Sequence, residues 1–427
     1  MTATRGTDPT QEGGPLLTTT AIVASCGAFV AIGALQALYG PAIPALREAY
    51  GIGPATAGLS LSAHFVGALL GVLAYHLLRG RLDNRTLLGG SYVLMAAGAA
   101  AFALSPSWTP ALAGAFVTGL GFGGVDYGLN RLFAIGFGPR RGAAMLNLLN
   151  GHFGIGAIVG PALVGRLGAQ SLPWIFLGAG AIGLLVLPTL GGVAAREPAP
   201  AAPADGAPPG GARVLPVIAA FIGVYVLHVA IETGVGGWEP THLEAAGYGA
   251  ATAATATSAY WAALTLGRFV AAPLSLRRSA PSILLVCCVG MAGFLLLATV
   301  PALAPYAYLG VGLAIAPIFP TCLPWLNRAV PGVGAAGAYV IAASMIGGVA
   351  FPPLLGALIG ATHVRALPLV LFLLAVACGA LGLWLRRRAP DRAGAPDPVG
   401  APDPVGAPDL RPAGRADAVT PPRTHPT

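Results

Sequence analysis

Residues 54–78 have the sequence PATAGLSLSAHFVGALLGVLAYHLL, a run that contains no aspartate, glutamate, lysine or arginine. A helix rises about 1.5 Å per residue and the hydrocarbon core of a bilayer is ~30 Å thick, so roughly 20 apolar residues are enough to cross it. This run is longer than that. It therefore predicts a helix that spans a membrane.

The rest of the chain has the same character. Hydrophobic residues make up 56% of the sequence and charged residues only 9%, whereas soluble domains are about 25% charged. We predict twelve spans, at 17–41, 54–78, 84–105, 110–135, 142–168, 172–194, 213–238, 250–274, 280–300, 302–327, 333–361 and 364–386. Helices are expected because an open sheet would leave its edge amide groups unpaired in lipid. The predicted fold class is an all-α membrane protein with 12 transmembrane helices.

The basic residues indicate the orientation of the chain. All 23 of them are arginine. With a cytoplasmic N-terminus, the inner loops and the C-terminal flank would carry Arg79, Arg81, Arg85, Arg140, Arg141, Arg196, Arg213, Arg277, Arg278, Arg328, Arg386, Arg387 and Arg388. The outer loops would carry only Arg47, Arg166 and Arg365. Since cytoplasmic loops are enriched in arginine and lysine, we expect a multi-pass protein of the cell membrane with both termini in the cytoplasm. The net charge of +8 then reflects topology: the lipid bilayer is an expected partner and nucleic acid is not.

Segments without long apolar runs separate the predicted membrane-spanning parts of the chain. We predict a cytoplasmic N-terminal tail at 1–16, a six-helix bundle at 17–194, a Pro/Ala/Gly linker at 195–212, a second six-helix bundle at 213–388 and a cytoplasmic tail at 389–427. The tail repeats a six-residue unit in GAPDPVGAPDPVGAPDL. So much proline and glycine cannot bury a core, and we expect this tail to be extended and disordered.

The two predicted bundles resemble each other in sequence. SAHFVGALLG at 62–71 matches SAYWAALTLG at 258–267, and IGAIVGPALVG at 155–165 matches IGGVAFPPLLG at 346–356. Single short matches between apolar segments arise by chance, but two in the same order favour parallel six-span repeats. Two pseudo-symmetric bundles related by an axis along the membrane normal are the architecture of the major facilitator fold.

The loop after the second span strengthens this resemblance. RGRLDNRTLLGG at 79–90 resembles the Gly–Asp–Arg-rich first inner loop of major facilitator transporters, with Gly80, Asp83 and Arg85 matching in kind. A weaker copy, LGRFVAAPLSLRR, follows the eighth span at 266–278. The resemblance implies a role in gating for these residues. The alternative is that the arginines only set the topology.

Four segments resemble the branch of that superfamily that contains the fucose:proton and the glucose/mannose:proton symporters. They are GLGFGGVDYGLN (119–130), RRGAAMLNLLNGHFGIGAIVGPALVG (140–165), YVLHVAIETGVGGWEPTHL (225–243) and SAYWAALTLGRF (258–269), within a resemblance that covers 17–388. It implies proton-coupled transport of a sugar or a similar polar metabolite by alternating access. Two features depart from it. Gln36 stands where the fucose symporter has an acid, and Gly156, Gly160 and Pro161 are similar to the motif of proton-driven efflux antiporters, so efflux is the alternative.

Asp126 and Glu232 are the acids that lie well inside predicted spans. An aspartate at a helix centre costs ~3 kcal/mol on insertion scales, so such residues usually face a bundle interior and mark a pathway. Withdrawal from water favours the protonated form of a carboxylate, which makes proton binding near neutral pH feasible. We predict proton coupling at Asp126 and Glu232. The alternative for Asp126 is a structural role, satisfied by Arg131 or a backbone amide.

Polar residues inside the spans are the candidate substrate ligands. They are Gln36, His64, Asn130, Asn147, Asn150, Trp238, Tyr260 and Asn327. Amides donate and accept hydrogen bonds, which suits hydroxyl-rich ligands, and an indole can stack on a sugar ring. The alternatives are hydrogen bonds between helices for the amides, packing for the aromatic residues and an interfacial position for Trp238. Arg131 and Arg268 lie near inner span ends, where we expect gate or loop contacts.

The sequence does not contain the common motifs of enzyme active sites. We find no Gly-x(4)-Gly-Lys phosphate loop, no HxxxH metal pair and no Ser/His/Asp set, so we expect no catalytic residue, no metal and no cofactor. The five cysteines fall inside spans without metal-ligand spacing. The expected partners are a small-molecule substrate and protons, and the expected state is a monomer. A membrane sensor is the third alternative, although it would require an ordered signalling domain.

Overall fold

The computed structural model describes residues 15–197, 214–275, 277–330 and 336–389. In these segments the chain is helical, apart from an isolated bridge between Leu17 and Val193. The helices are α1 (Thr19–Tyr50), α2 (Pro54–Leu78), α3 (Asn84–Ala103), α4 (Trp108–Gly136), α5 (Gly138–Leu167), α6 (Leu172–Leu185), α7 (Val214–Ala245), α8 (Ala250–Ser275), α9 (Ala280–Leu297), α10 (Ala304–Ile315), α11 (Ile318–Ala329), α12 (Ala336–Ala361) and α13 (Leu367–Arg388). Short 3₁₀ turns are η1 (Ala169–Ser171), η2 (Leu187–Gly192), η3 (Pro301–Leu303) and η4 (Val364–Ala366).

These elements form twelve helical spans. α6 continues into η2 as one span, and α10 and α11 together form another, interrupted at Ala316 and Pro317. Within the described residues, ten spans are long and apolar enough to cross a membrane, and α4 and α8 complete the twelve. The predicted all-α membrane class is confirmed.

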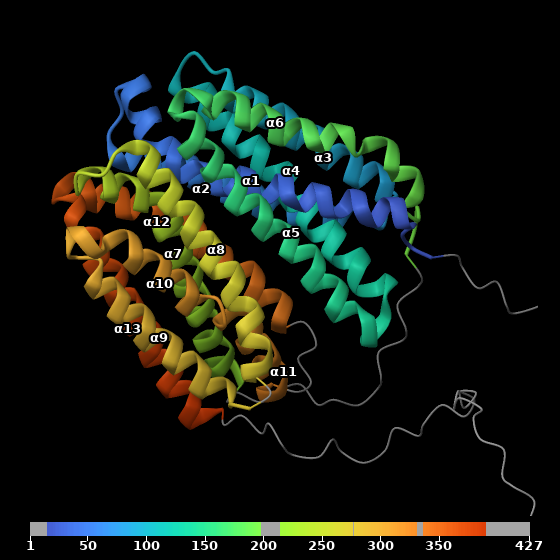
Figure 1. Ribbon diagram of the computed structural model, residues 1–427. Helices are drawn as coiled ribbons and strands as arrows, with labels where there is room; N and C mark the ends of the chain where they lie inside the picture. The colour runs from blue at the N-terminus through green and yellow to red at the C-terminus, as the bar shows by residue number, and fades with distance from the viewer. Residues whose placement is uncertain (1–14, 198–213, 276, 331–335, 390–427) are drawn as a thin grey trace, which may run out of the picture. The chain divides into compact units, whose positions relative to one another are not determined.

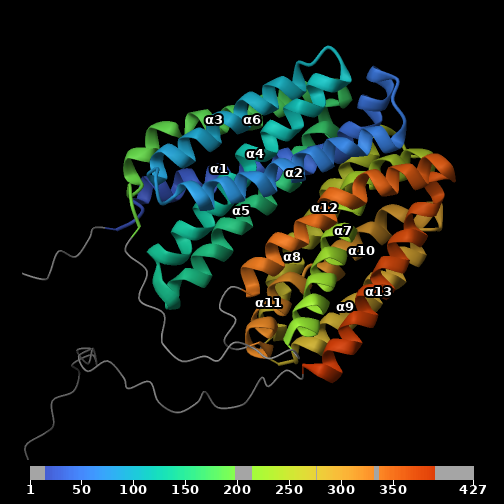
Figure 2. The ribbon, with the colours of Figure 1, turned by 180° about the vertical axis from the view of Figure 1, so that it is seen from behind.

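The spans form two bundles of six, drawn from blue to green and from yellow to red in Figures 1 and 2. In the first bundle α4 packs against α2 and α3, and α1 packs against α5. In the second, α7 packs against α12 and α13, and α8 packs against α10. The bundles meet through α2 with α12, α5 with α8, and α1 with α7.

Equivalent glycines show the pseudo-symmetry of the two bundles. Each lies where two helices cross, and a side chain there would collide with a backbone carbonyl oxygen of the facing helix. The pairs are Gly156 with Val30, Gly119 with His64, Gly347 with Val226 and Gly312 with Tyr260. His64 and Tyr260 lie in the first sequence repeat, and Gly156 and Gly347 in the second. The repeat in sequence is therefore also a repeat of helix contacts.

An even number of spans puts the start of α1 and the end of α13 on one side, here called the terminal face, with the distal face opposite. Near the distal face the bundles touch backbone to backbone. A Cβ atom at Gly40 would collide with the carbonyl oxygen of Gly236, and one at Gly58 would lie 2.7 Å from the carbonyl oxygen of Pro352. The Trp238 indole donates to that same Pro352 oxygen at 3.1 Å. These contacts close the distal side.

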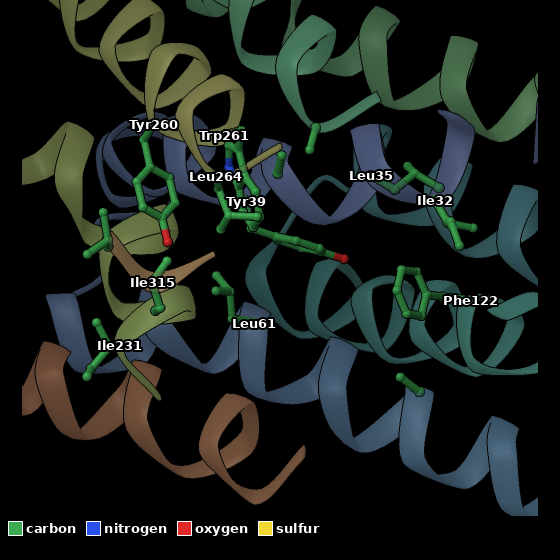
Figure 3. Packing of buried hydrophobic residues seen from close by; sticks show 14 of the residues in the cluster. Ile32, Leu35, Tyr39, Leu61, Phe122, Ile231, Tyr260, Trp261, Leu264 and Ile315 are labelled. Carbon is green, nitrogen blue, oxygen red and sulfur yellow. The ribbon is translucent and has the colours of Figure 1, made fainter. Parts of the chain in front are cut away.

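Contacts between the bundles continue to about the middle of the membrane. There Gly348 of α12 lies against the Phe65 ring, and the rings of Phe153 and Trp261 are 6.5 Å apart. Figure 3 shows buried side chains from both bundles, among them Leu61 and Tyr39 of the first and Leu264 and Trp261 of the second. This apolar layer separates the distal closure from the polar residues described next.

The seventh span differs from its prediction. We expected it to end at 238, whereas α7 is one helix from Val214 to Ala245. Its glycines are covered by neighbouring helices, and Gly236 lies against the Trp261 ring. Tertiary packing therefore overrides the low helix propensity of glycine.

The predicted linker also differs at its start. The carbonyl of Ala195 accepts from the N–H of Asn84 at 2.8 Å, so the chain leaving α6 is attached to the first bundle. Most of the predicted linker, the N-terminal tail through residue 14 and the C-terminal tail from 390 lie outside the described residues.

Candidate functional site

Asp126 lies on α4. Its Oδ1 accepts a hydrogen bond from Asn130 Nδ2 at 2.9 Å, as expected for residues four apart on a helix. Asn130 Oδ1 in turn accepts from Asn150 Nδ2 of α5 at 3.0 Å. All three side chains are partly exposed. The result is a chain of polar groups, carboxylate to amide to amide, that links two helices of the first bundle.

Arg131 does not neutralise Asp126. Its guanidinium donates to both oxygens of Glu197, at distances of 2.7 to 2.9 Å, and Arg79 lies 3.8 Å from the same carboxylate. Arg131 therefore makes a loop contact, which is one of the two roles considered for it. The structural alternative in which Arg131 satisfies Asp126 is absent from this conformation.

The loop between α2 and α3 holds the end of the sixth span. Arg85 Nε donates to the carbonyl of Val193 at 2.7 Å. Asp83 caps α3 by accepting from the N–H of Thr86 at 2.8 Å, and this hydrogen bond holds the pKa of Asp83 below its ordinary value. Gly80 is exposed. The residues predicted to gate the inner side thus fasten neighbouring segments of the first bundle together.

Glu232 lies near the middle of α7 and has a different kind of partner. His228 Nε2, one turn earlier, is 3.4 Å from Glu232 Oε2, with only 3% of the His228 side chain and 13% of the Glu232 side chain exposed. The Tyr260 hydroxyl donates to the backbone carbonyl of Glu232 at 3.3 Å. Arg268 of α8, partly exposed, lies within electrostatic range of the carboxylate. The acid of the second bundle is therefore surrounded by potential cations.

Three predicted ligands face no open space in this conformation. His64 is fully buried, and its Nδ1 is 3.4 Å from the Tyr39 hydroxyl. Tyr260 is fully buried as well. Trp238 is neither a cavity wall nor an interfacial residue here, because it is fully buried in the distal closure.

The remaining predicted ligands are scattered. Asn147 and Asn327 are exposed, and Asn327 lies near the end of α11. Gln36 is partly exposed on α1. The structure thus brings Asp126, Asn130 and Asn150 together but joins neither Asn147 nor Asn327 to them by a hydrogen bond among the described contacts.

Two acids were missed by the sequence analysis. Glu197 was assigned to the linker, and the arginine pair that holds it, Arg79 and Arg131, comes from separate spans. Glu239 was placed at the end of the seventh span, but α7 continues past it and buries it completely. The signal available for Glu239 was the motif Trp-Glu-Pro, in which a charged residue follows a run of apolar residues and glycines.

The fold and these contacts can be compared with known proteins. The sequence profile of the Major Facilitator Superfamily matches residues 24–332. The chain belongs to this superfamily. It is a multi-pass membrane protein with a transporter fold, as predicted. No curated protein matches its sequence.

Several solved transporters share this major facilitator fold. A D-xylose-proton symporter is 13% identical, with 88% of this chain and 99% of that chain covered and a TM-score of 0.72. A POT peptide transporter bound to alafosfalin is 12% identical, with 88% and 98% covered and a TM-score of 0.71. The E. coli fucose:proton symporter is 18% identical, with 84% and 98% covered and a TM-score of 0.56. Identities this low establish the fold and leave the substrate open.

Proposed function

We propose that this protein is a proton-coupled secondary transporter of a sugar or a similar small polar metabolite, working as a monomer by alternating access. The observation that carries the proposal is the Asp126–Asn130–Asn150 chain, in which a membrane carboxylate accepts from one amide side chain and that amide accepts from a second. We assign the terminal face to the cytoplasm of the cell, in agreement with the arginine-rich loops.

The amide chain suggests how a proton and a ligand are coupled. An ionised Asp126 can only accept hydrogen bonds, and it accepts one from Asn130 Nδ2. A protonated Asp126 gains an O–H donor and competes less strongly for that amide. Asn130 and Asn150 are then free to bind the hydroxyl groups of a ligand. Proton binding therefore changes the hydrogen-bonding capacity of the site.

The distal closure fits one half of an alternating-access cycle. In this conformation Gly40, Gly58 and Trp238 close the distal side, while the amide chain lies on the terminal side of the apolar layer. Rocking of the two bundles about this layer would open the distal side and close the terminal one.

Proton-driven efflux of a drug-like or secreted metabolite is the second candidate. It rests on the Gly156–Gly160–Pro161 motif of α5, which packs closely on α1: a Cβ at Gly160 would lie 3.2 Å from the carbonyl oxygen of Ala34. Both candidates use the same fold, so the ligand that moves protons decides between them.

The test uses purified protein in liposomes that contain a pH-sensitive dye, with hexoses, 6-deoxyhexoses and hydrophobic cations added in turn. We expect a sugar to drive proton flux in the wild type and no flux above empty liposomes in Asp126→Asn. Glu48→Gln, which alters an exposed acid near the end of α1, is the matched control and should retain flux. Flux driven only by a hydrophobic cation would replace symport by efflux, and sugar-driven flux that survives Asp126→Asn would move the coupling role to another acid.

A further inference from the structure

Glu239 is the most unusual buried group in the second bundle. Its side chain is fully buried in α7, and neither of its carboxylate oxygens has a hydrogen-bond partner. No salt bridge joins it to a cation within the described part of the chain. An ionised carboxylate without partners in a membrane interior costs several kcal/mol or more. A neutral, protonated Glu239 avoids that cost.

The groups around Glu239 do not supply a counter-charge. The Thr257 hydroxyl of α8 faces the carboxyl group but donates to the carbonyl of Ala253 at 3.2 Å. The phenols of Tyr260 on α8 and Tyr308 on α10 lie within electrostatic range of it. Tyr308 is already engaged by His242 Nδ1 at 3.0 Å. The immediate surroundings are hydroxyl groups, which suit a neutral acid.

Ionisable groups on the other neighbouring elements contact residues other than Glu239. Arg365 of η4 lies near His242, and Arg47 of α1 lies near Glu244, both towards the distal face. The thiol of Cys378 on α13 faces the carbonyl of Val224, several turns away towards the terminal face.

The same cluster lies next to a proline inside the helix. Pro240 has no N–H, so the carbonyl of Gly236 lacks its usual helical donor, and this is the carbonyl against which Gly40 of α1 packs. Gly237 packs against Leu61 of α2, where a Cβ would lie 3.1 Å from a Leu61 methyl carbon. The distal third of α7 is therefore covered by the first bundle. Separation of α7 from α1 and α2 would expose this part of the helix to water.

We propose that Glu239 is a second proton-binding site, which holds a proton while the distal side is closed and exchanges it with distal water when α7 separates from α1 and α2. In the exchange the O–H bond of the carboxylic acid breaks, its electron pair stays on the carboxylate oxygen and the proton passes to water. Closure reverses the step. The proposal deepens the proposed function, and rests on it for the distal opening during transport.

The first experiment asks whether Glu239 holds a proton, by infrared spectroscopy of the purified full chain at neutral pH. We expect the C=O stretching band of a protonated carboxylic acid in the wild type and its partial loss in Glu239→Gln. The amide is close to isosteric with the neutral acid, so the variant should fold. Asp83→Asn is the control and should leave the band intact. An unchanged band in Glu239→Gln would overturn the proposal.

The second experiment asks whether opening the distal side releases the proton. Gly40→Trp places a large side chain against the Gly236 carbonyl and should wedge the distal side open. Opening is verified by the reaction of Leu61→Cys with a water-soluble maleimide, since Leu61 and the native cysteines are buried. We expect the Glu239 band to fall by more than half. A band that persists although Leu61→Cys reacts would overturn the exchange.

A second wedge and the absence of substrate keep the outcomes separable. Gly58→Trp acts on the α2–α12 contact instead and replaces Gly40→Trp if the latter does not fold. Neither infrared measurement uses a transported ligand. If no sugar moves protons in liposomes but both infrared results hold, the proposed substrate class fails and the Glu239 site stands. If sugar-driven proton flux is found but the infrared band is unchanged in Glu239→Gln, the Glu239 proposal is wrong and the proposed function stands.

Discussion

The polar centres of the two bundles hold their carboxylates in opposite ways. Asp126 of the first bundle accepts from an amide, and Arg131, on the same helix, is bound to Glu197 instead. Glu232 of the second bundle lies 3.4 Å from the His228 imidazole. A proton added to Asp126 changes a hydrogen bond to an amide, whereas a proton added to Glu232 changes a contact with a second titratable group. The comparison favours Asp126 as the coupling group and the His228–Glu232 pair as a contact that stabilises α7.

The largest effect is expected from breaking the Glu232 pair. Glu232→Leu leaves the buried His228 imidazole without its partner, and His228→Leu leaves the buried carboxylate without its partner. A buried polar group left unpaired costs about 1–3 kcal/mol, so we expect each single variant to lose transport on the order of 100-fold. The measurement is initial uptake in liposomes, normalised to total reconstituted protein.

The double variant decides whether the two residues act as a unit. With both polar groups removed, His228→Leu combined with Glu232→Leu should be no worse than either single change, because the pair energy is lost only once. Losses that multiply in the double variant would show that His228 and Glu232 act independently, and the contrast with Asp126 would then fail.

The next effect tests the symmetry on which the comparison depends. Gly119 and Gly312 occupy equivalent helix crossings, against the carbonyls of His64 and Tyr260. Overpacking a close contact costs about 1–3 kcal/mol, so Gly119→Ala and Gly312→Ala should lower stability by similar amounts of about 2 kcal/mol. Thermal unfolding in detergent measures both. Gly151, where a Cβ meets nothing within 4 Å, provides the control substitution to alanine. A large effect at only one of the two positions would mean that the bundles are not packed alike.

The sequence predicts the fold well because its signals are local. Long uncharged runs define the spans, and the repeats at 62–71 and 258–267 place His64 and Tyr260 at crossings that prove equivalent. The Asp126–Asn130 contact is also local, since a separation of four residues puts both side chains on one helix face. Asn150 was named as a ligand, but its bond to Asn130 joins separate helices and is visible only in the fold.

The features that sequence did not reveal depend on contacts between distant segments. Trp238 was expected at a cavity or an interface, and it is buried because Pro352, far along the chain, offers a carbonyl at the bundle contact. Glu239 was expected at a span end, since three nearby glycines and a proline lower helix propensity. Packing against the first bundle extends α7 past them. Burial of a group by a distant helix has no local sequence signal.

A smaller effect is expected from shortening the amide chain. Asn150→Leu removes the donor to Asn130 Oδ1 while keeping the volume of the side chain. A net hydrogen bond is worth about 1 kcal/mol, so we expect KM for the transported ligand to rise on the order of 10-fold. Asn147→Leu, at an exposed position on the same helix, is the control and should change KM little. An equal effect of both variants would remove the amide chain from the site and leave Asp126 as an isolated acid.

The smallest effect concerns a third carboxylate, which lies outside the membrane and contrasts with both of the others. The Thr86 N–H stabilises ionised Asp83 and lowers its pKa, so this contribution is present at neutral pH and is lost as the pH falls through the lowered pKa. Asp83→Ala should lower the melting temperature at pH 7 by only about 1 °C, and the difference from wild type should begin to shrink near the ordinary aspartate pKa of about 3.9 and vanish only below the lowered pKa of the folded protein. Asp83→Asn keeps the cap and should show neither effect. A difference that persists in acid would mean that Asp83 stabilises the protein through packing and not through its charge. The contrast in titration between the water-exposed Asp83 and the membrane carboxylate Asp126 would then fail.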